Sequence, residues 1–248
     1  MRLDVLALAA HRDDVEQTCG GTLLKMAEQG ATTGILDLTA GEMGTRGSAL
    51  ERGLESEQAA ALLRVHWRGN LGLPDGALEL TQEFKLRVAE AIRDTRPRIL
   101  IVPYPAARHP DHATAGRLGF EGAFLAGLQK LVFASSESTA YRPQTVLYAS
   151  LYANERPHFV VDIAEQFETR LQALLAYRSQ YADQAAGKDI FVAEQDIRAR
   201  SEALARTYGM MVGATYGEPF ISPTPARVND LRDLHLDTFT RGGLIAPF

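Results

Sequence analysis

Histidines and aspartates gather in two short clusters that could bind a metal ion and activate water. The first cluster is residues 11–14 (His-Arg-Asp-Asp) and the second is residues 109–112 (His-Pro-Asp-His). A catalytic zinc site typically has about three protein ligands and one position open for water, and imidazole and carboxylate groups both suit it. The two clusters together hold enough of these groups for one such site.

Each side chain of the clusters has a chemical role open to it. Three of them could supply the metal ligands: His11, Asp14 and His112. Hydrolysis also needs a base to accept the proton of the attacking water and an acid to assist the leaving amine, and Asp13 and His109 remain for these roles. Asp111 could hydrogen-bond a histidine and fix its tautomer.

Other interpretations of the clusters stay open. An Asp-Asp pair after a strand is more commonly a helix N-cap with a favourable dipole contact, although two His/Asp clusters at matching strand ends seldom arise by chance. Two histidines and a carboxylate can also bind iron in an oxygenase. The spare carboxylate of Asp13 favours hydrolysis, because oxygen activation does not require a base beside the metal.

Short apolar runs predict the strands that must carry these clusters. Runs of this kind, without a helical stripe, are typical of buried strands. The predicted strands are residues 3–10, 32–39, 65–71, 98–104, 145–152 and 159–163. The first strand leads directly to His11, and the strand at 98–104 leads to His109. Because ligands of parallel sheets gather at the carboxyl ends of the strands, we expect both clusters at the same edge.

Helical periodicity separates most of these runs. Helices are predicted at residues 14–29, through 59–63, and at 81–95, 165–177 and 192–211, with a glycine-punctuated loop at 40–48. Strands that alternate with helices imply right-handed crossovers and a mainly parallel sheet. We therefore predict one α/β domain over residues 1–248, with a Rossmann-like, mainly parallel sheet flanked by helices and a smaller C-terminal strand and helix elaboration. The tail from residue 222 is not assigned.

Composition narrows the class of protein. The 248 residues are 46% hydrophobic, which is ample for a sizeable core, and the net charge of −5 argues against nucleic-acid binding. One cysteine, Cys19, cannot form an intrachain disulfide, and we expect it to be a packed thiol. Without a signal-like N-terminus or a membrane-length apolar stretch, the expectation is a cytoplasmic protein with a small-molecule partner.

The two clusters resemble the motifs of the LmbE-like, or PIG-L, de-N-acetylase superfamily. Its usual first motif is A-H-P-D-D, which residues 10–14 match except for Arg12 in place of proline. This resemblance implies metal-dependent deacetylation of an N-acetylglucosamine conjugate, with Zn²⁺ as the cofactor and Fe²⁺ as an alternative. Carried over, it makes His11, Asp14 and His112 the ligands and Asp13 the general base. It also makes His109 the electrostatic or acid partner, oriented by Asp111.

Further short stretches are similar to the bacillithiol-pathway branch, which removes acetate from N-acetylglucosaminyl malate. They are residues 39–47, Arg52 with Glu55, 70–75, Arg108, 178–181 and 216–220. Malate carries two carboxylates, and arginine offers planar paired donors to such anions. The predicted substrate contacts are Arg46, Arg52, Arg108 and, toward the sugar hydroxyls, Asp75. The resemblance also suggests a homo-oligomer, a hexamer among the options.

Two rival functions remain at this point. One is an amidase or deacetylase for another glucosamine-linked conjugate, such as a thiol conjugate or another N-acetylglucosaminyl glycoside. The other is a noncatalytic protein that binds sugar or metal. A nucleotide-binding oxidoreductase is disfavoured because the first turn has aspartates where a glycine-rich phosphate loop would be, and the sequence lacks the G-x-S-x-G elbow of many serine hydrolases.

Overall fold

A seven-stranded sheet forms the centre of the protein in this computed structural model, which describes residues 1–133, 139–149, 156–182, 194–230 and 232. The strands are β1 (Val5–Ala9), β2 (Thr33–Thr39), β3 (Trp67–Leu73), β4 (Ile99–Pro103), β5 (Thr145–Ala149), β6 (Phe159–Asp162) and β7 (Gly217–Ile221). Their order is β3-β2-β1-β4-β5-β7-β6. The first five strands in this order are parallel to one another, and β7 is antiparallel to its neighbours β5 and β6. The predicted single α/β domain with a mainly parallel sheet is confirmed.

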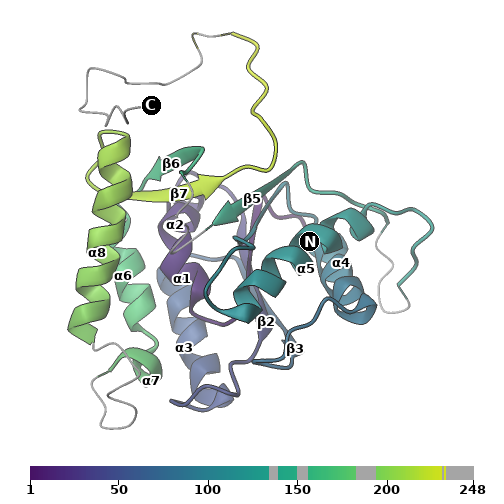
Figure 1. Cartoon of the computed structure of the whole chain (residues 1–248), viewed down its shortest axis with the longest axis horizontal. Helices are drawn as coiled ribbons and strands as arrows, with labels where there is room; N and C mark the ends of the chain where they lie inside the picture. Colours follow the sequence, from purple (N-terminus) through teal and green to yellow (C-terminus); the bar gives the residue numbers. More distant parts are fainter. Residues whose placement is uncertain (134–138, 150–155, 183–193, 231, 233–248) are drawn as a thin grey trace.

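Helices cover both faces of this sheet (Figure 1). They are α1 (Asp14–Thr18), α2 (Gly20–Glu28), α3 (Ala49–Leu62), α4 (Gln82–Thr95), α5 (Pro110–Ala126), α6 (Phe167–Leu175), α7 (Arg178–Tyr181) and α8 (Glu194–Met211). α4 and α5 lie on one face, α1, α2, α3 and α6 lie on the other, and α8 packs outside α6 and against β7. Among the helices of the described residues, none has the length and apolar character that a membrane span requires.

Alternate residues of β1 point to opposite faces of the sheet and pack in two separate core clusters. Leu6 and Leu8 pack in the cluster that includes Val88 of α4 and Leu118 of α5. The intervening residues, Val5, Ala7 and Ala9, pack instead with Val15, Cys19 and Leu23 on the α1 and α2 side. Because both faces of β1 are buried, its sequence is a continuous apolar run, as expected for a central parallel strand.

The order in which strands are added to the sheet reverses at β1: β2 and β3 lie on one side of it, and β4 and β5 lie on the other. β1 pairs with β2 on one side and with β4 on the other, so the carboxyl ends of β1 and β4 meet at the topological switch point. His11 follows β1, and His109 follows β4 at the start of α5. The sheet order therefore brings the two clusters together at one edge.

Three elements differ from the sequence-based expectation. The predicted helix at 14–29 is two helices, because Cys19 has non-helical backbone angles. Helix α5 and strand β7 were not predicted. Along α5 the apolar pattern is interrupted by three glycines, at which an added Cβ would lie 2.2–2.6 Å from atoms of β4 or α4. The predicted strand at 145–152 ends at Ala149 in β5, and residues 150–152 lie outside the described residues, as do 192–193 of the predicted helix 192–211.

Gly116 allows α5, and with it the second cluster, to lie close to β4. A Cβ at this position would be 2.2 Å from the carbonyl oxygen of Pro103. We expect Gly116→Ala to lower the free energy of unfolding by about 1–3 kcal/mol, because the backbone clash outweighs the gain of about 1 kcal/mol that alanine usually brings inside a helix. Urea denaturation measures this change.

The matched control is Arg117→Ala, at the next residue of the same helix, where the side chain is exposed. It should leave the free energy of unfolding within about 0.5 kcal/mol of the wild type. Equal stability of the Gly116 variant and this control would contradict the close approach.

Candidate active site

The first cluster lies at the turn between β1 and α1. Asp13 occupies the N-cap position of α1, but within the described residues its side chain makes no capping hydrogen bond. The carboxylate of Asp14 instead accepts a hydrogen bond from the backbone N–H of His11, at 2.8 Å. The two aspartates therefore do more than cap a helix: Asp14 closes the turn, and Asp13 is left to face the cavity.

The second cluster forms the first turn of α5. Pro110 is the first helical residue, where its missing N–H costs nothing, and His109 is the N-cap. Nδ1 of His109 accepts a hydrogen bond from the backbone N–H of Asp111, at 3.2 Å. This turn directs the ring of His112 toward the first cluster.

Ligand atoms of His11, Asp14 and His112 converge on one point. Nδ1 of His11 and Nε2 of His112 are 3.2 Å apart, and the carboxylate oxygens of Asp14 lie 3.1 Å from His112 Nε2 and 3.5 Å from His11 Nδ1. Tetrahedral coordination with bonds of about 2.0–2.1 Å separates ligand atoms by roughly 3.3 Å. These three predicted residues thus form a candidate metal site with suitable spacing and donor types.

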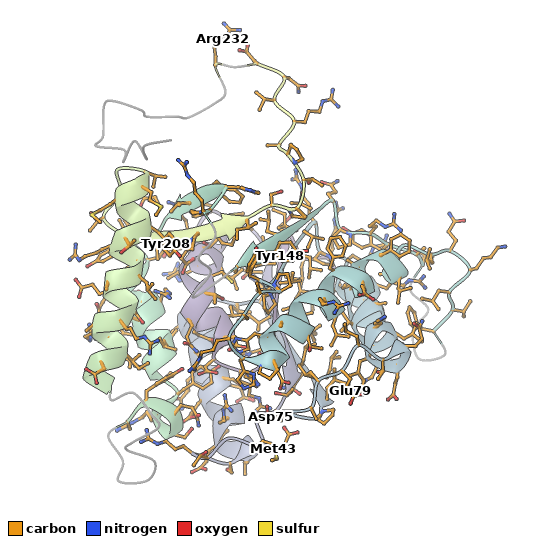
Figure 2. The ribbon with its side chains drawn as sticks, in the orientation of Figure 1. Met43, Asp75, Glu79, Tyr148, Tyr208 and Arg232 are labelled. Carbon is orange, nitrogen blue, oxygen red and sulfur yellow. The ribbon has the colours of Figure 1, made fainter. Side chains whose placement is uncertain are left out.

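The other ring nitrogen of His11 faces two carboxylates. Nε2 lies 3.1 Å from Asp75 and 3.4 Å from Asp111. Hydrogen bonds to these groups assign the proton of a neutral ring to Nε2 and leave the lone pair of Nδ1 for a metal. Asp75, which was predicted from the sequence as a substrate contact, therefore supports His11. Its second oxygen accepts a hydrogen bond from the N–H of Met43 at 2.9 Å, and Asp75 and Met43 lie next to each other in Figure 2.

The carboxylate of Asp111 lies against the ring of His11, whereas it was predicted to orient His109. Its carboxylate is buried and accepts from the backbone N–H groups of Gly76 and Leu78, at 2.8 and 3.3 Å. It lies against His11, whereas its contact with His109 is through the backbone N–H alone. This carboxylate fixes the loop at 76–78 and the ring of His11 together.

The carboxylates make a positive charge favourable at the centre of the site. Although burial opposes protonation, hydrogen bonds to Asp111 and Asp14 raise the pKa of His11 to about 12. Burial alone would raise the pKa of Asp14, but His112 and His11 hold it well below its ordinary value. A divalent cation would satisfy the same electrostatic demand, so the residues fit a metal.

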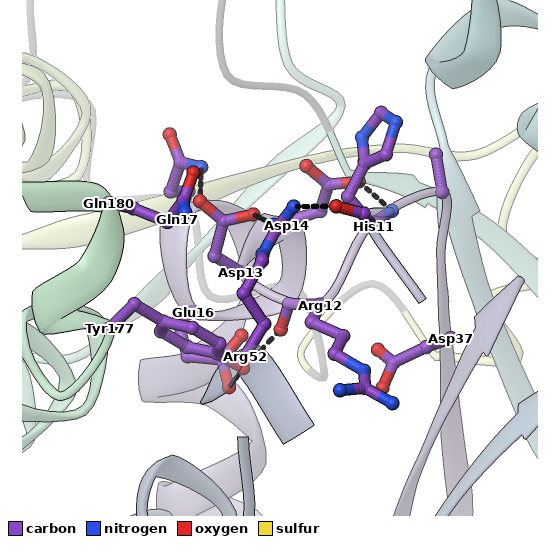
Figure 3. Close-up of polar contacts among 12 residues, drawn as sticks. His11, Arg12, Asp13, Asp14, Glu16, Gln17, Asp37, Arg52, Tyr177 and Gln180 are labelled. Carbon is purple, nitrogen blue, oxygen red and sulfur yellow. Dashed lines mark hydrogen bonds and ion pairs between the residues drawn. The ribbon is translucent and has the colours of Figure 1, made fainter. Parts of the chain in front are cut away.

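Three donors hold the carboxylate of Asp13. Nη2 of Arg52 lies 3.1 Å from Oδ1, Nε2 of Gln17 lies 3.3 Å from Oδ2, and the hydroxyl of Tyr181 also donates to Oδ2. Figure 3 shows Asp13 between Gln17 and Arg52. Burial and the adjacent charge raise the pKa of Tyr181 well above its ordinary value, so its hydroxyl remains a donor. Asp13 is thus a carboxylate oriented by three donors beside the candidate metal site.

His109 lies next to the ligand pair on the cavity wall. Its ring centroid is 4.9 Å from that of His11 and 5.1 Å from that of His112. Partial burial and the charges of these two rings lower its pKa. Since its Nδ1 accepts the N–H of Asp111, the proton of a neutral ring resides on Nε2, which can donate a hydrogen bond.

A cavity of about 430 Å³ adjoins these residues. Its walls come from the ends of β1 and β4, the loops at 43–44, 75–76 and 104–109, and the helices α7 and α8. Arg52 and Arg108, which were predicted to contact the substrate, line this cavity, and so does Arg200 of α8, which the sequence did not single out. Substrate contact by these arginines remains a prediction. Arg46 is buried against α7, where its guanidinium donates to the carbonyl of Gln180 at 3.1 Å.

A buried network under the first cluster was missed at the sequence level. Arg68 of β3 donates to Glu16 at 2.7 Å and to Asp37 at 2.9 Å, and it also contacts the carbonyl of Arg12. Tyr177 donates to the same carbonyl and to Glu16. Burial raises the pKa of Glu16 to about 7 despite Arg68. A charged residue, Asp37, inside the apolar strand 32–39 was the signal that could have predicted this network.

Arg12, which replaces the usual proline of the motif, has a place of its own. Its Nη1 donates to the carbonyl of Ala49 at the start of α3, at 2.7 Å, and the guanidinium lies over Gly53. The side chain therefore joins the turn at 11–14 to α3.

Comparison with known proteins agrees with this site. The family model PIG-L, described as GlcNAc-PI de-N-acetylase, matches residues 6–123, which include both clusters. The diacetylchitobiose deacetylase of Thermococcus kodakarensis is 32% identical over 86% of this chain and 80% of its own length. A probable N-acetyl-alpha-D-glucosaminyl L-malate deacetylase 2 of Bacillus anthracis is 28% identical over 72% of this chain and 81% of its own length.

A solved structure has the same fold. The conserved protein TT1542 from Thermus thermophilus superposes with a TM-score of 0.82 at 40% identity, over 91% of this chain and 97% of that chain. The chain therefore belongs to the PIG-L, or LmbE-like, family and is an N-deacetylase.

Proposed function

We propose that this enzyme uses a zinc ion held by His11, Asp14 and His112 to remove the acetyl group from N-acetylglucosaminyl L-malate, as in bacillithiol biosynthesis. The observation that carries the zinc proposal is the convergence of two imidazole nitrogens, 3.2 Å apart, with the two oxygens of the Asp14 carboxylate, 3.1 and 3.5 Å from them, beside the oriented carboxylate of Asp13. Fe²⁺ is the alternative metal, because it accepts the same donor set.

The residues around the ligands have complementary tasks in amide hydrolysis. A bound metal would supply Lewis-acid polarisation and make water easier to deprotonate. Asp13 takes the proton of the attacking water, and Arg52 with Tyr181 orients its carboxylate. Nε2 of His109 donates to the oxyanion that forms from the acetamide carbonyl. As the C–N bond breaks, the proton that Asp13 took from water passes to the amine, and acetate and the free glucosamine conjugate leave.

The malate proposal is supported by charge on the cavity wall. Arg108 is exposed there, where a guanidinium can bind a carboxylate through paired donors. The Bacillus anthracis relative is named for this substrate. A second candidate is diacetylchitobiose, a neutral disaccharide, because the Thermococcus relative named for it is 32% identical.

We further propose the setting in which the enzyme works. Residues 1–248 would act as one deacetylase domain, in the cytoplasm, as a homo-oligomer such as a hexamer. The resemblance to the family supports this assembly, and the small cavity supports a small-molecule substrate in place of nucleic acid or a membrane surface.

Acetate release from N-acetylglucosaminyl malate and from diacetylchitobiose tests the reaction and the substrate together. We expect faster release from the malate conjugate, loss of turnover after chelation, and recovery on addition of zinc. Free N-acetylglucosamine is the control. Faster turnover of diacetylchitobiose would move the assignment to the second candidate, and turnover that survives complete chelation would refute the metal proposal.

Two variants separate the base from the ligands. Asp13→Asn should bind zinc with nearly unchanged affinity and lower kcat by about 10²–10⁴-fold, because only proton transfer is lost. His112→Ala should lose both zinc and turnover. Calorimetric zinc titration and kcat measure these effects, with His158→Ala as a histidine control outside the site. Full zinc stoichiometry in the His112 variant would exclude that residue as a ligand.

Arg108→Gln tests the anion contact. Loss of a charge-assisted hydrogen bond worth about 1.5 kcal/mol should raise KM for the malate conjugate roughly tenfold. KM for diacetylchitobiose should remain within about twofold of the wild-type value, because that sugar carries no carboxylate. Arg117→Gln, an exposed arginine of α5, is the control. Equal effects on both substrates would argue against a malate contact.

A further inference from the structure

The two aspartates of the first cluster are carried by a very short helix. α1 has five residues, and Cys19 separates it from α2 with backbone angles of φ −143° and ψ 15°. A single helical turn is not stable alone, and its last carbonyl groups have no partners inside the helix. Other parts of the protein must therefore determine where α1, and with it Asp13 and Asp14, lies.

Arg170 of α6 holds the end of α1. Its Nε donates to the carbonyl of Glu16 at 3.0 Å, and its Nη2 donates to the carbonyl of Gln17. The side chain of Gln17 in turn donates to Asp13. A guanidinium at the carboxyl end of a helix also meets the negative end of the helix dipole.

Glu218 of β7 holds the start of α2 on the other side of the break. Its carboxylate accepts from the backbone N–H groups of Gly21 and Thr22, at 2.9 and 2.7 Å, and from the Thr22 hydroxyl at 2.6 Å. A Cβ on Gly21 would be 3.0 Å from Glu218 Oε1 and 2.9 Å from a methyl carbon of Ile163, so glycine is needed for this approach. The carboxylate meets the positive end of the helix dipole.

The two side chains also pair with each other across the break. Nε of Arg170 lies 3.1 Å from Oε1 of Glu218, and the two residues are 4% and 2% exposed. Burying an ion pair costs desolvation free energy that apolar side chains would avoid. A pair that satisfies backbone groups on both sides of a helix break has a function that apolar residues cannot supply.

We infer that Arg170 and Glu218 are positioning residues of this deacetylase: together they fix the angle between α1 and α2 and so place Asp14 among the ligands and Asp13 beside them. The inference rests on the proposed function, in which Asp14 binds the metal and Asp13 is the base. Both residues come from the carboxyl-terminal part of the chain, in α6 and β7, which thereby positions the first cluster.

Glu218→Gln and Arg170→Lys test this inference, with Arg93→Lys as the matched control. Arg93 is also buried and donates to three backbone carbonyls, those of Ala126, Leu128 and Leu131, at the far end of α5 from the site. Zinc affinity of the stripped protein, kcat, KM and the melting temperature are measured for each variant. Zinc binding is a readout that does not depend on the choice of substrate.

We expect both test variants to weaken zinc binding and to lower kcat by about 10–100-fold each, with KM within about threefold of the wild type. Arg93→Lys should lower the melting temperature while zinc affinity and kcat stay within about twofold. If the test variants lose only stability, as the control does, the pair is structural and the inference is wrong.

A milder variant covers the case in which Glu218→Gln does not fold. Thr22→Val removes one donor to Glu218 and keeps both charges, so a smaller loss of zinc affinity in the same direction is expected, and unchanged affinity would overturn the inference. If the wild type deacetylates none of the substrates, the proposed function fails. The comparison of zinc affinities still decides the positioning role.

Discussion

Four carboxylates share a small volume with three imidazoles, and their mutual repulsion is the constraint on which this site depends. The carboxylates of Asp13, Asp14, Asp75 and Asp111 can lie together only where donors and positive charge offset each one. Each carboxylate has its own donors. Asp13 is held by Arg52, Gln17 and Tyr181, and Asp14 by the rings of His11 and His112. Asp75 accepts from the N–H of Met43, and Asp111 accepts from the N–H groups of Gly76 and Leu78. The negative field that results selects a cation at the centre.

These assignments divide the carboxylates by task. Asp14 and Asp13 come from the same turn, yet Asp14 points toward the two imidazoles while Asp13 is kept by Arg52 on the cavity wall. Asp75 and Asp111 act on the far nitrogen of His11. His11, a candidate ligand, thus has two carboxylate partners, which fix its ring and increase its basicity.

Sequence reasoning predicted the convergence of the candidate ligands but not the groups that support them. The motifs at 11–14 and 109–112 each follow an apolar strand, and a parallel sheet must bring such strand ends to one edge, so the convergence of His11 and His112 was predictable. The contacts of Asp75 with His11 and of Arg46 with Gln180 depend on loop conformations, for which a single sequence carries no periodic signal. The break at Cys19 could not be predicted either, since the residues that stabilise it lie far along the chain.

The long sequence separation of these contacts has a consequence for folding during synthesis on the ribosome. Residues 16–22 are held by Arg170, Tyr177 and Glu218, and the hydrogen bond from Gly21 to Glu218 spans 197 residues of sequence. Contacts of such separation form late, after the intervening chain has been synthesised and folded. The amino-terminal half can build its strands during translation, whereas the contacts that hold residues 16–22 need the later segments that carry α6 and β7. We therefore expect the candidate metal site to be completed late in synthesis, after β7 has been made.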